Sequence, residues 1–198
     1  MRTIAVVLAF AALPLFAEPR TYTVTSDGKN VAGFLVDDAF ETIDGTTTKL
    51  AGTIIADPAN PAGSSVEIDV DLAPIDTGIS LRDSDIREKY TQPSKYPQAT
   101  FKSVSVTAPT GAIAPNQPIE VTVTGDFSLH GVTKRITVPV RVVLIPESDI
   151  TRSTRGAGDW IHVTAKFPVK LSEFGIHIPT SFANDTIAVR LDLFGHGK

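Results

Sequence analysis

The sequence predicts an all-β domain built from antiparallel strands. The clearest sign is the stretch from Ile119 to Leu144, where apolar and polar side chains alternate on both sides of a turn at His130-Gly131. Because strand side chains alternate between two faces, this stretch predicts a hairpin with one apolar and one solvated face. A hairpin alone is not stable in water, so further half-buried strands must cover it. The same alternation recurs along the chain, which favours a closed barrel or a sandwich.

Seven further segments read as strands, giving about eight or nine strands in all. They span residues 22–25, 31–37, 49–56, 65–72, 99–106, 160–171 and 186–194. A barrel of about eight strands can be filled by side chains or can hold one small ligand. The residues expected to face inward are mainly Val and Ile, with few large aromatic side chains to fill the interior. This composition favours an apolar cavity, although the sequence alone leaves both arrangements open.

The chain length fits one domain with a substantial core, and its N-terminus is typical of a secretory signal peptide. Arg2 precedes a short apolar run from Ile4 to Phe16, and Ala17 offers a small residue for cleavage before Glu18. We therefore expect a signal peptide at residues 1–17 and a mature domain at residues 18–198. A membrane anchor or a first buried strand is the alternative interpretation of the same run.

Composition excludes several classes of function. The formal net charge of -4 makes the chain a poor partner for nucleic acid, which is bound by neutralising phosphates. The sequence holds no cysteine, which excludes disulfides, thiolate metal sites and a lipoprotein anchor. No stretch after Ala17 is long and apolar enough for a membrane-spanning helix, so we expect a soluble exported protein.

One polar insertion interrupts the strands. Ser80 and Asp83 partly match a capping box, which predicts a short helix from Leu81 to Tyr90 lying across an end of the sheet. Asp83 and Arg87 are four residues apart and could form a surface ion pair. Alternatively, Arg82 or Arg87 stands at the mouth of a cavity and binds an anionic head group, for which a guanidinium is suited. Residues 146–158 read as a polar loop.

Residues capable of chemistry are few. Asp126, Ser128 and His130 offer the side chains of a catalytic triad, but neighbours on one flat strand face form neither a pocket nor an oxyanion hole. We instead expect His130 to bond locally to backbone at its turn, and we predict no catalytic residue and no enzymatic activity.

A metal site is equally weakly indicated. Glu67, Asp69 and Asp71 share one strand face, which suggests either a calcium site or a solvated outer face. Calcium ligands usually wrap around the ion, so the solvated face is favoured. No histidine spacing typical of a zinc site occurs, and we predict no bound metal.

Four ordered motifs resemble the YceI-like family. They are TGISLRD at residues 77–83, KYPQATF at 95–101, GDFSLHGVTK at 125–134 and LSEFGI at 171–176, followed by Pro179. The resemblance runs from about Asn30 to Gly195. It implies a bacterial periplasmic or secreted protein with a lipocalin-like antiparallel β-barrel of about eight strands and a short helical insertion. It also implies an elongated apolar pocket for a polyisoprenoid or similar lipid. Residues 84–87 depart from the family, where many relatives carry a His-Leu pair and two aromatic residues.

We therefore expect a binding protein that sequesters or carries a polyisoprenoid or quinone-like lipid, with no cofactor other than that bound molecule. The expected ligand-binding residues are Phe101, Val123, Phe127, Val138, Val163, Phe167, Val189 and Leu191, with Arg82 near the head group. The alternative is a stress-related protein-interaction module that uses the barrel as a scaffold and acts through residues 79–97. An enzyme acting on an exported lipid ranks last, and a homodimer is left open.

Overall fold

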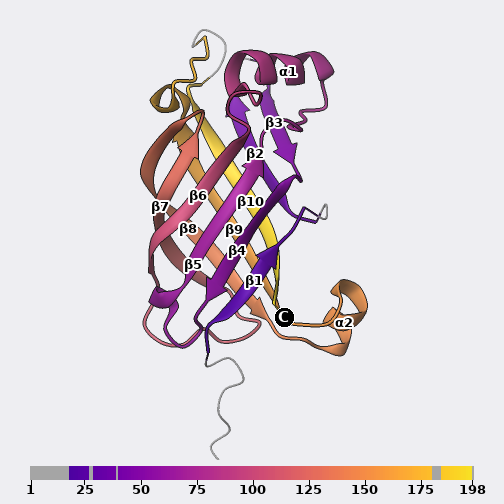
Figure 1. The fold of residues 1–198 in the computed structure, drawn as a ribbon, viewed down its shortest axis with the longest axis vertical. Coiled ribbons are helices and arrows are strands. Elements are labelled where there is room, and N and C mark those ends of the chain that lie inside the picture. Colours follow the sequence, from indigo (N-terminus) through magenta and orange to yellow (C-terminus); the bar gives the residue numbers. More distant parts are fainter. Residues whose placement is uncertain (1–17, 27–28, 39, 180–183, 198) are drawn as a thin grey trace, which may run out of the picture.

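The structure is a closed antiparallel β-barrel, as the sequence predicts. This computed structural model describes residues 18–197 apart from 27–28, 39 and 180–183, so the expected signal peptide lies outside the described residues. Ten strands form one sheet in the order β1-β4-β5-β6-β7-β8-β9-β10-β2-β3, and β1 also pairs with β10 (Figure 1). The strands are β1 (Arg20–Val24), β2 (Val31–Asp37), β3 (Thr42–Thr47), β4 (Leu50–Ala56), β5 (Ser65–Asp71), β6 (Gln98–Thr107), β7 (Ile119–Leu129), β8 (Val132–Ile145), β9 (Trp160–Lys170) and β10 (Thr186–Gly197).

The ten strands occupy eight positions around the barrel, because two positions are shared. β1 pairs with the C-terminal end of β10, where Tyr22 lies opposite Gly197. β2 pairs further back along the same edge of β10, where Ala32 lies opposite Leu191. β4 and β3 in turn pair with β1 and β2, respectively. The chain therefore builds two of the eight positions from interrupted strands.

Asn30 holds the interruption between β1 and β2 together. Its side chain is 1% exposed, and its Nδ2 donates to the Thr25 carbonyl at 2.9 Å. The Phe194 amide of β10 donates to Asn30 Oδ1 at 2.6 Å. This amide lies between the part of β10 that pairs with β1 and the part that pairs with β2. A side chain thus supplies the acceptor that a continuous strand would supply from its backbone.

The second interrupted position, formed by β3 and β4, leaves part of the wall with few backbone hydrogen bonds. β3 meets the chain after β5 at one bridge, in which Thr46 and Asp76 exchange two backbone hydrogen bonds of 2.9 Å. We call this line between β3 and residues 72–79 the seam. Leu72 and Ile75 cover it from within and are 6% and 7% exposed. The seam is therefore closed mainly by side-chain packing.

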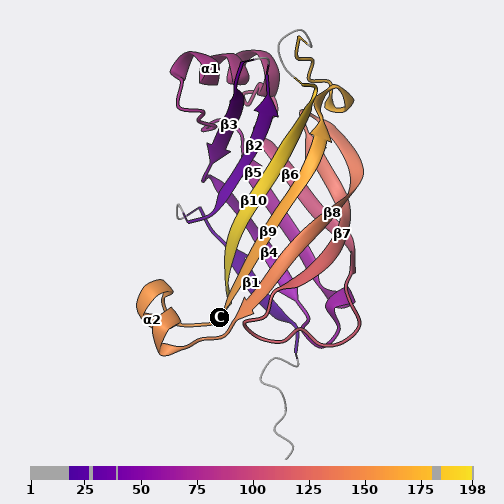
Figure 2. The same cartoon turned by 180° about the vertical axis from the view of Figure 1, so that it is seen from behind.

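Helical segments lie at opposite ends of the barrel. The insertion between β5 and β6 forms α1 (Ser80–Asp85) and a π-helical turn, η2 (Ile86–Thr91), which occupy one end (Figure 1). The chain between β8 and β9 forms α2 (Asp149–Arg155) at the other end, beside the barrel rather than over it (Figure 2). We call these the α1 end and the α2 end. The described residues also form two 3₁₀ turns, η1 (Pro61–Gly63) and η3 (Leu171–Phe174).

The predicted cap of the insertion is wrong, although its helix is present. The N-cap residue is Ile79 rather than Ser80, and no side chain caps it. Asp83 instead accepts hydrogen bonds from the Thr77 amide at 2.9 Å and from the Thr77 hydroxyl at 2.6 Å. Because Asp is one methylene shorter than the usual Glu, the capping geometry was only partly matched in the sequence. The i,i+4 ion pair also differs from prediction, since it joins Asp85 and Lys89 at 2.8 Å.

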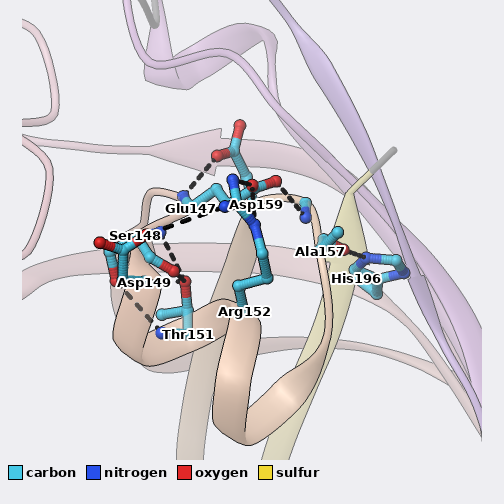
Figure 3. Close-up of polar contacts among 9 residues, drawn as sticks. Glu147, Ser148, Asp149, Thr151, Arg152, Ala157, Asp159 and His196 are labelled. Carbon is cyan, nitrogen blue, oxygen red and sulfur yellow. Dashed lines mark hydrogen bonds and ion pairs between the residues drawn. The ribbon is translucent and has the colours of Figure 1, made fainter.

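The prediction of a loop at residues 146–158 is also wrong, because this segment contains α2. Ser148 and Thr151 form a capping box, and Glu147 accepts from Arg152 (Figure 3). Beyond the helix, His196 of β10 hydrogen-bonds the Ala157 carbonyl at 2.6 Å. The helix has no apolar periodicity and buries none of its residues. Polar contacts at its ends hold it in place, so the hydrophobic pattern of the sequence did not predict it.

Candidate functional site

The barrel encloses an apolar cavity with a volume of about 200 Å³. Its lining runs from Pro61 and Ile113 at the α2 end to Leu72, Ile75 and Leu129 towards the α1 end. Among the described residues, no charged side chain lines it, and the polar ones are confined to a few serines and threonines. Apolar cavities of about 150 Å³ lined by Leu, Ile and Phe stay dry and bind benzene. The interior is therefore suited to a hydrocarbon group.

Inward residues of every wall position contribute to this lining. The eight apolar residues selected from the sequence all lie in it, namely Phe101, Val123, Phe127, Val138, Val163, Phe167, Val189 and Leu191. The regular alternation of the long strands explains this placement, because one correct inward residue fixes the others. That these side chains contact a ligand remains a prediction.

Two phenylalanines lie against glycines of the neighbouring strand. A Cβ added at Gly125 would lie 2.5 Å from Phe101 Cζ, and one added at Gly45 would lie 2.4 Å from Phe34 Cε1. Each ring thus occupies the space that a side chain on the next strand would fill, and both rings line the cavity. Sequence reasoning missed Phe34 and Gly45, because β3 shows no apolar alternation and was not predicted as a strand. Aromatic residues are therefore present in the lining, but the glycines keep them at its wall.

A phenylalanine cluster closes the barrel interior at the α1 end. Phe127 makes edge-to-face contacts with Phe167 and Phe174, at centroid distances of 6.0 and 5.4 Å. Phe174 belongs to η3 and is 3% exposed. Edge-to-face pairs are favourable beyond the area they bury. The short η3 segment therefore covers the barrel interior at this end.

At the α2 end the interior is filled. Ile113 folds under the barrel, and its amide donates to the Pro58 carbonyl at 2.8 Å. Tyr22 is fully buried, and burial raises the pKa of its phenol. Leu144 is also fully buried. The cavity therefore has a floor made of packed side chains.

His130 connects the β7–β8 turn to the cover. It has a φ of 52° and is followed by Gly131 at 78°, the positive values that a type I′ hairpin turn requires. Its Nδ1 donates to the Phe174 carbonyl at 3.2 Å, so the predicted local bond is replaced by a contact across 44 residues. The Tyr96 ring packs on His130 at a centroid distance of 4.3 Å. The sequence offers no sign of such a distant acceptor.

Arg82 lies in a polar network at the α1 end and is not among the residues that line the cavity. Its Nε donates to the Thr77 hydroxyl at 2.9 Å, and another guanidinium nitrogen pairs with Glu41 at 2.5 Å. Asp83 completes the network. The Thr77 hydroxyl hydrogen bond, more than any other contact, holds the pKa of Asp83 below its ordinary value. The network ties α1 to the β2–β3 hairpin, and a head-group contact by Arg82 stays a prediction.

The three triad-like side chains are separated by their partners. Asp126 forms a two-point ion pair with Arg135, and Ser128 bonds Thr133 at 2.7 Å.

The acidic face of β5 is also engaged with other groups. Glu67 pairs with Lys102 at 3.1 Å, and Asp71 accepts from the Ala73 amide. In the part of the chain that the structure describes, no three potential metal-ligating side chains cluster. No described helix is long and apolar enough to span a membrane.

The four sequence motifs meet at the α1 end. Tyr96 of the second motif contacts His130 of the third, and His130 bonds Phe174 of the fourth. Lys134 and Glu173 pair at 2.8 Å. The first motif forms the Thr77–Asp83 network. Segments far apart in sequence thus build one structure around the cover and the insertion.

A match to the YceI-like domain covers residues 22–194, which is nearly the whole barrel. The chain belongs to the YceI-like family. It is 30% identical to Protein YceI of Escherichia coli O157:H7 over 152 residues, covering 76% of this chain and 72% of that protein. It is 31% identical over 179 residues to a UPF0312 protein of Vibrio cholerae serotype O1, covering 86% and 85%. The resemblance drawn from the four motifs is thereby confirmed.

Solved structures share the fold of this family member. BcnA of Burkholderia cenocepacia superposes with a TM-score of 0.69 at 23% identity, covering 86% of this chain and 98% of BcnA. A domain from Saccharophagus degradans superposes with a TM-score of 0.66 at 16% identity, covering 90% and 100%. The latter is described as a polyisoprenoid-binding domain implicated in plant cell wall breakdown. At these identities the likeness shows the barrel fold.

Proposed function

We propose that this protein binds the apolar chain of a polyisoprenoid or quinone-like lipid inside the barrel. The observation that carries the proposal is the charge-free lining, which extends from the floor towards the phenylalanine cover. Moving hydrocarbon from water into such a space gains about 25 cal/mol per Å² of buried apolar surface. The polyisoprenoid-binding description of the Saccharophagus domain, which shares the fold, supports this class of ligand.

The size of the cavity limits how much of a ligand it holds. Since a cavity of about 150 Å³ accepts benzene, about 200 Å³ accepts a short piece of hydrocarbon. A long polyprenyl chain would therefore place one end in the lumen and extend beyond it, or would need the seam to part.

The proposed role is sequestration or carriage rather than catalysis, in the periplasm or outside a bacterial cell. Support for the location comes from the signal-like residues 1–17. Support for a binding role comes from the apolar interior, whose described lining residues include no paired acid and base groups of the kind that catalysis needs.

Extraction of the native ligand tests the proposal. The mature chain is purified from its own host, extracted with organic solvent, and the extract is identified by mass spectrometry. We expect an isoprenoid or quinone in stoichiometric amount, and a Val138→Asp variant, which places a charge in the lining, should yield none. A stoichiometric polar molecule, or a lipid bound equally by the variant, would contradict the proposal.

A second candidate function is protein docking at the α1 end. It is favoured by three exposed apolar side chains there, Phe40, Ile79 and Leu81, which are 89%, 49% and 76% exposed. The Arg82–Glu41 ion pair brings their segments together. Crosslinking at Leu81 in the native host would test it, and lipid-free protein that crosslinks to one partner would favour this function over the first.

A further inference from the structure

The contact between Phe34 and Gly45 sets the width of the cavity beside the seam. Phe34 of β2 lies directly opposite Gly45 of β3, and both residues line the cavity. The three atoms nearest to a Cβ added at Gly45 all belong to the Phe34 ring, at 2.4, 2.5 and 3.2 Å. The ring therefore lies flat against β3 in space that only a glycine leaves free.

A methyl group at Gly45 would have one main consequence. Real Cβ atoms do not approach other atoms this closely, so the ring would have to leave the wall. β3 closes that side of the barrel, which leaves the lumen as the space available to the displaced ring. A methyl group at Gly125 would displace more than the Phe101 ring, because the added Cβ would also lie 2.6 Å from the Lys102 carbonyl oxygen of the backbone. Gly45 is therefore the position where lumen width can be changed most selectively.

We propose that the Phe34–Gly45 pair is a specificity determinant that makes room for the methyl branches of an isoprenoid chain. The inference rests on the proposed lipid-binding function. A methyl-branched chain is wider than a straight acyl chain, so it needs a flat wall where the branches lie. The apolar ring and the missing side chain provide this wall next to the seam. A narrower lumen would still admit an unbranched chain.

The test compares farnesol with dodecanol, whose chain has the same backbone length without branches. Affinities are measured by displacement of N-phenyl-1-naphthylamine from the mature protein. We expect Gly45→Ala to weaken farnesol binding by about ten-fold, the scale at which an added methyl group disturbs a packed interior, and dodecanol binding by much less. Thr48→Ala, at an exposed position just after β3, is the matched control and should change neither.

Two variants keep the test independent of folding. Phe34→Leu removes the ring that the methyl group would displace, so the double variant Phe34→Leu with Gly45→Ala should recover farnesol binding. Phe34→Trp leaves the glycine in place and should narrow the lumen, with the same selective loss of farnesol. Thermal unfolding of each variant is recorded alongside.

The outcomes separate the two levels of inference. Unchanged farnesol binding in folded Gly45→Ala and Phe34→Trp, or equal loss of both alcohols, would overturn the specificity role while leaving lipid binding intact. Absence of any binding by the wild-type protein, to the probe or to either alcohol, would overturn the proposed function and this inference with it.

Discussion

The continuous and the interrupted parts of the barrel wall are held together in different ways. β7 pairs with β8 over its whole length, β9 pairs with β10 over its whole length, and β8 joins β9 through residues Val140 to Ile145. Apolar residues of these four strands line the cavity. β1 to β4 are short, share two wall positions, and depend on Asn30 and on one bridge at Thr46 for closure. Long backbone ladders join the strands of the first part. In the second part the backbone ladders are short and interrupted, so individual side chains contribute to its closure, and it is where the Phe34–Gly45 pair and the seam lie.

The comparison predicts the largest loss of stability for a substitution in the continuous wall. Leu144 of β8 is fully buried, so Leu144→Ala should lower the free energy of unfolding by about 2–5 kcal/mol through lost burial and a residual cavity. Denaturant unfolding measures this value. Leu81→Ala on α1 is the control, since that side chain is 76% exposed and the change should stay within about 0.5 kcal/mol. Similar losses in the two variants would contradict the packing described for the wall.

A smaller but more local effect is expected at Asn30. Asn30→Ala removes the acceptor of the buried Phe194 amide, and an unsatisfied buried group costs about 1–3 kcal/mol. Native-state hydrogen exchange should show faster exchange at Phe194, with amides of β7 and β8 changed only by the global loss of stability. If the Phe194 amide stays as protected relative to β7 as in the wild type, the closure does not depend on Asn30.

The sequence predicts the continuous part of the wall better than the interrupted part. From Val121 to Leu129 every second residue is buried, so alternation alone located β7, its partner and their lining side chains. In β3 the residues are Thr, Ile, Asp, Gly, Thr and Thr, and the decisive inward position is a glycine. A glycine carries no hydrophobic signal, so neither the strand nor its role beside Phe34 could be predicted. Asn30 reads as a turn residue, because one of its partners, the Phe194 amide of β10, comes beside it only in the closed barrel, whereas the other, the Thr25 carbonyl, is local.

The insertion is expected to contribute modestly to the free energy of unfolding, and this contribution is lost at acid pH. The Thr77 hydroxyl, then the Thr77 amide and the charges of Arg87 and Arg82, lower the pKa of Asp83 in the folded protein, against an opposing effect of burial. An Asp in the unfolded chain has a pKa of about 3.9. The folded pKa lies below this, so the stabilisation is complete above about pH 4 and is lost as pH falls through the folded pKa.

Asp83→Asn isolates this contribution, because the other carboxylates with lowered pKa are shared by both proteins. We expect the variant to be less stable by about 1 kcal/mol at neutral pH, because a charged carboxylate makes stronger hydrogen bonds than the neutral amide that replaces it, and we expect the difference from wild type to shrink as pH falls below about 4. Urea unfolding across this pH range measures it. A difference that grows towards acid pH would show that the sign is wrong and that Asp83 is not held ionised by Thr77.

The smallest stability effect, and the most specific one for function, is expected at the Arg82–Glu41 pair. Glu41 is 52% exposed at its side chain, so Arg82→Gln should cost only about 0–1 kcal/mol of stability. If Arg82 meets an anionic head group, that group competes with Glu41 for the same guanidinium. Arg82→Gln should then weaken farnesyl diphosphate binding several-fold, and Glu41→Gln should strengthen it, while farnesol binding changes in neither variant. Direct titration of both ligands measures the four ratios.

The opposite signs expected for the two glutamine variants matter more than either magnitude. A purely structural ion pair loses the same interaction whichever partner is removed, so both variants would shift affinity in the same direction or leave it unchanged. Only an arginine that is shared between Glu41 and a ligand gives a gain on one side and a loss on the other. Because farnesol lacks the charge, any change in its affinity would instead report movement of α1 against the β2–β3 hairpin, and the head-group role of Arg82 would be rejected.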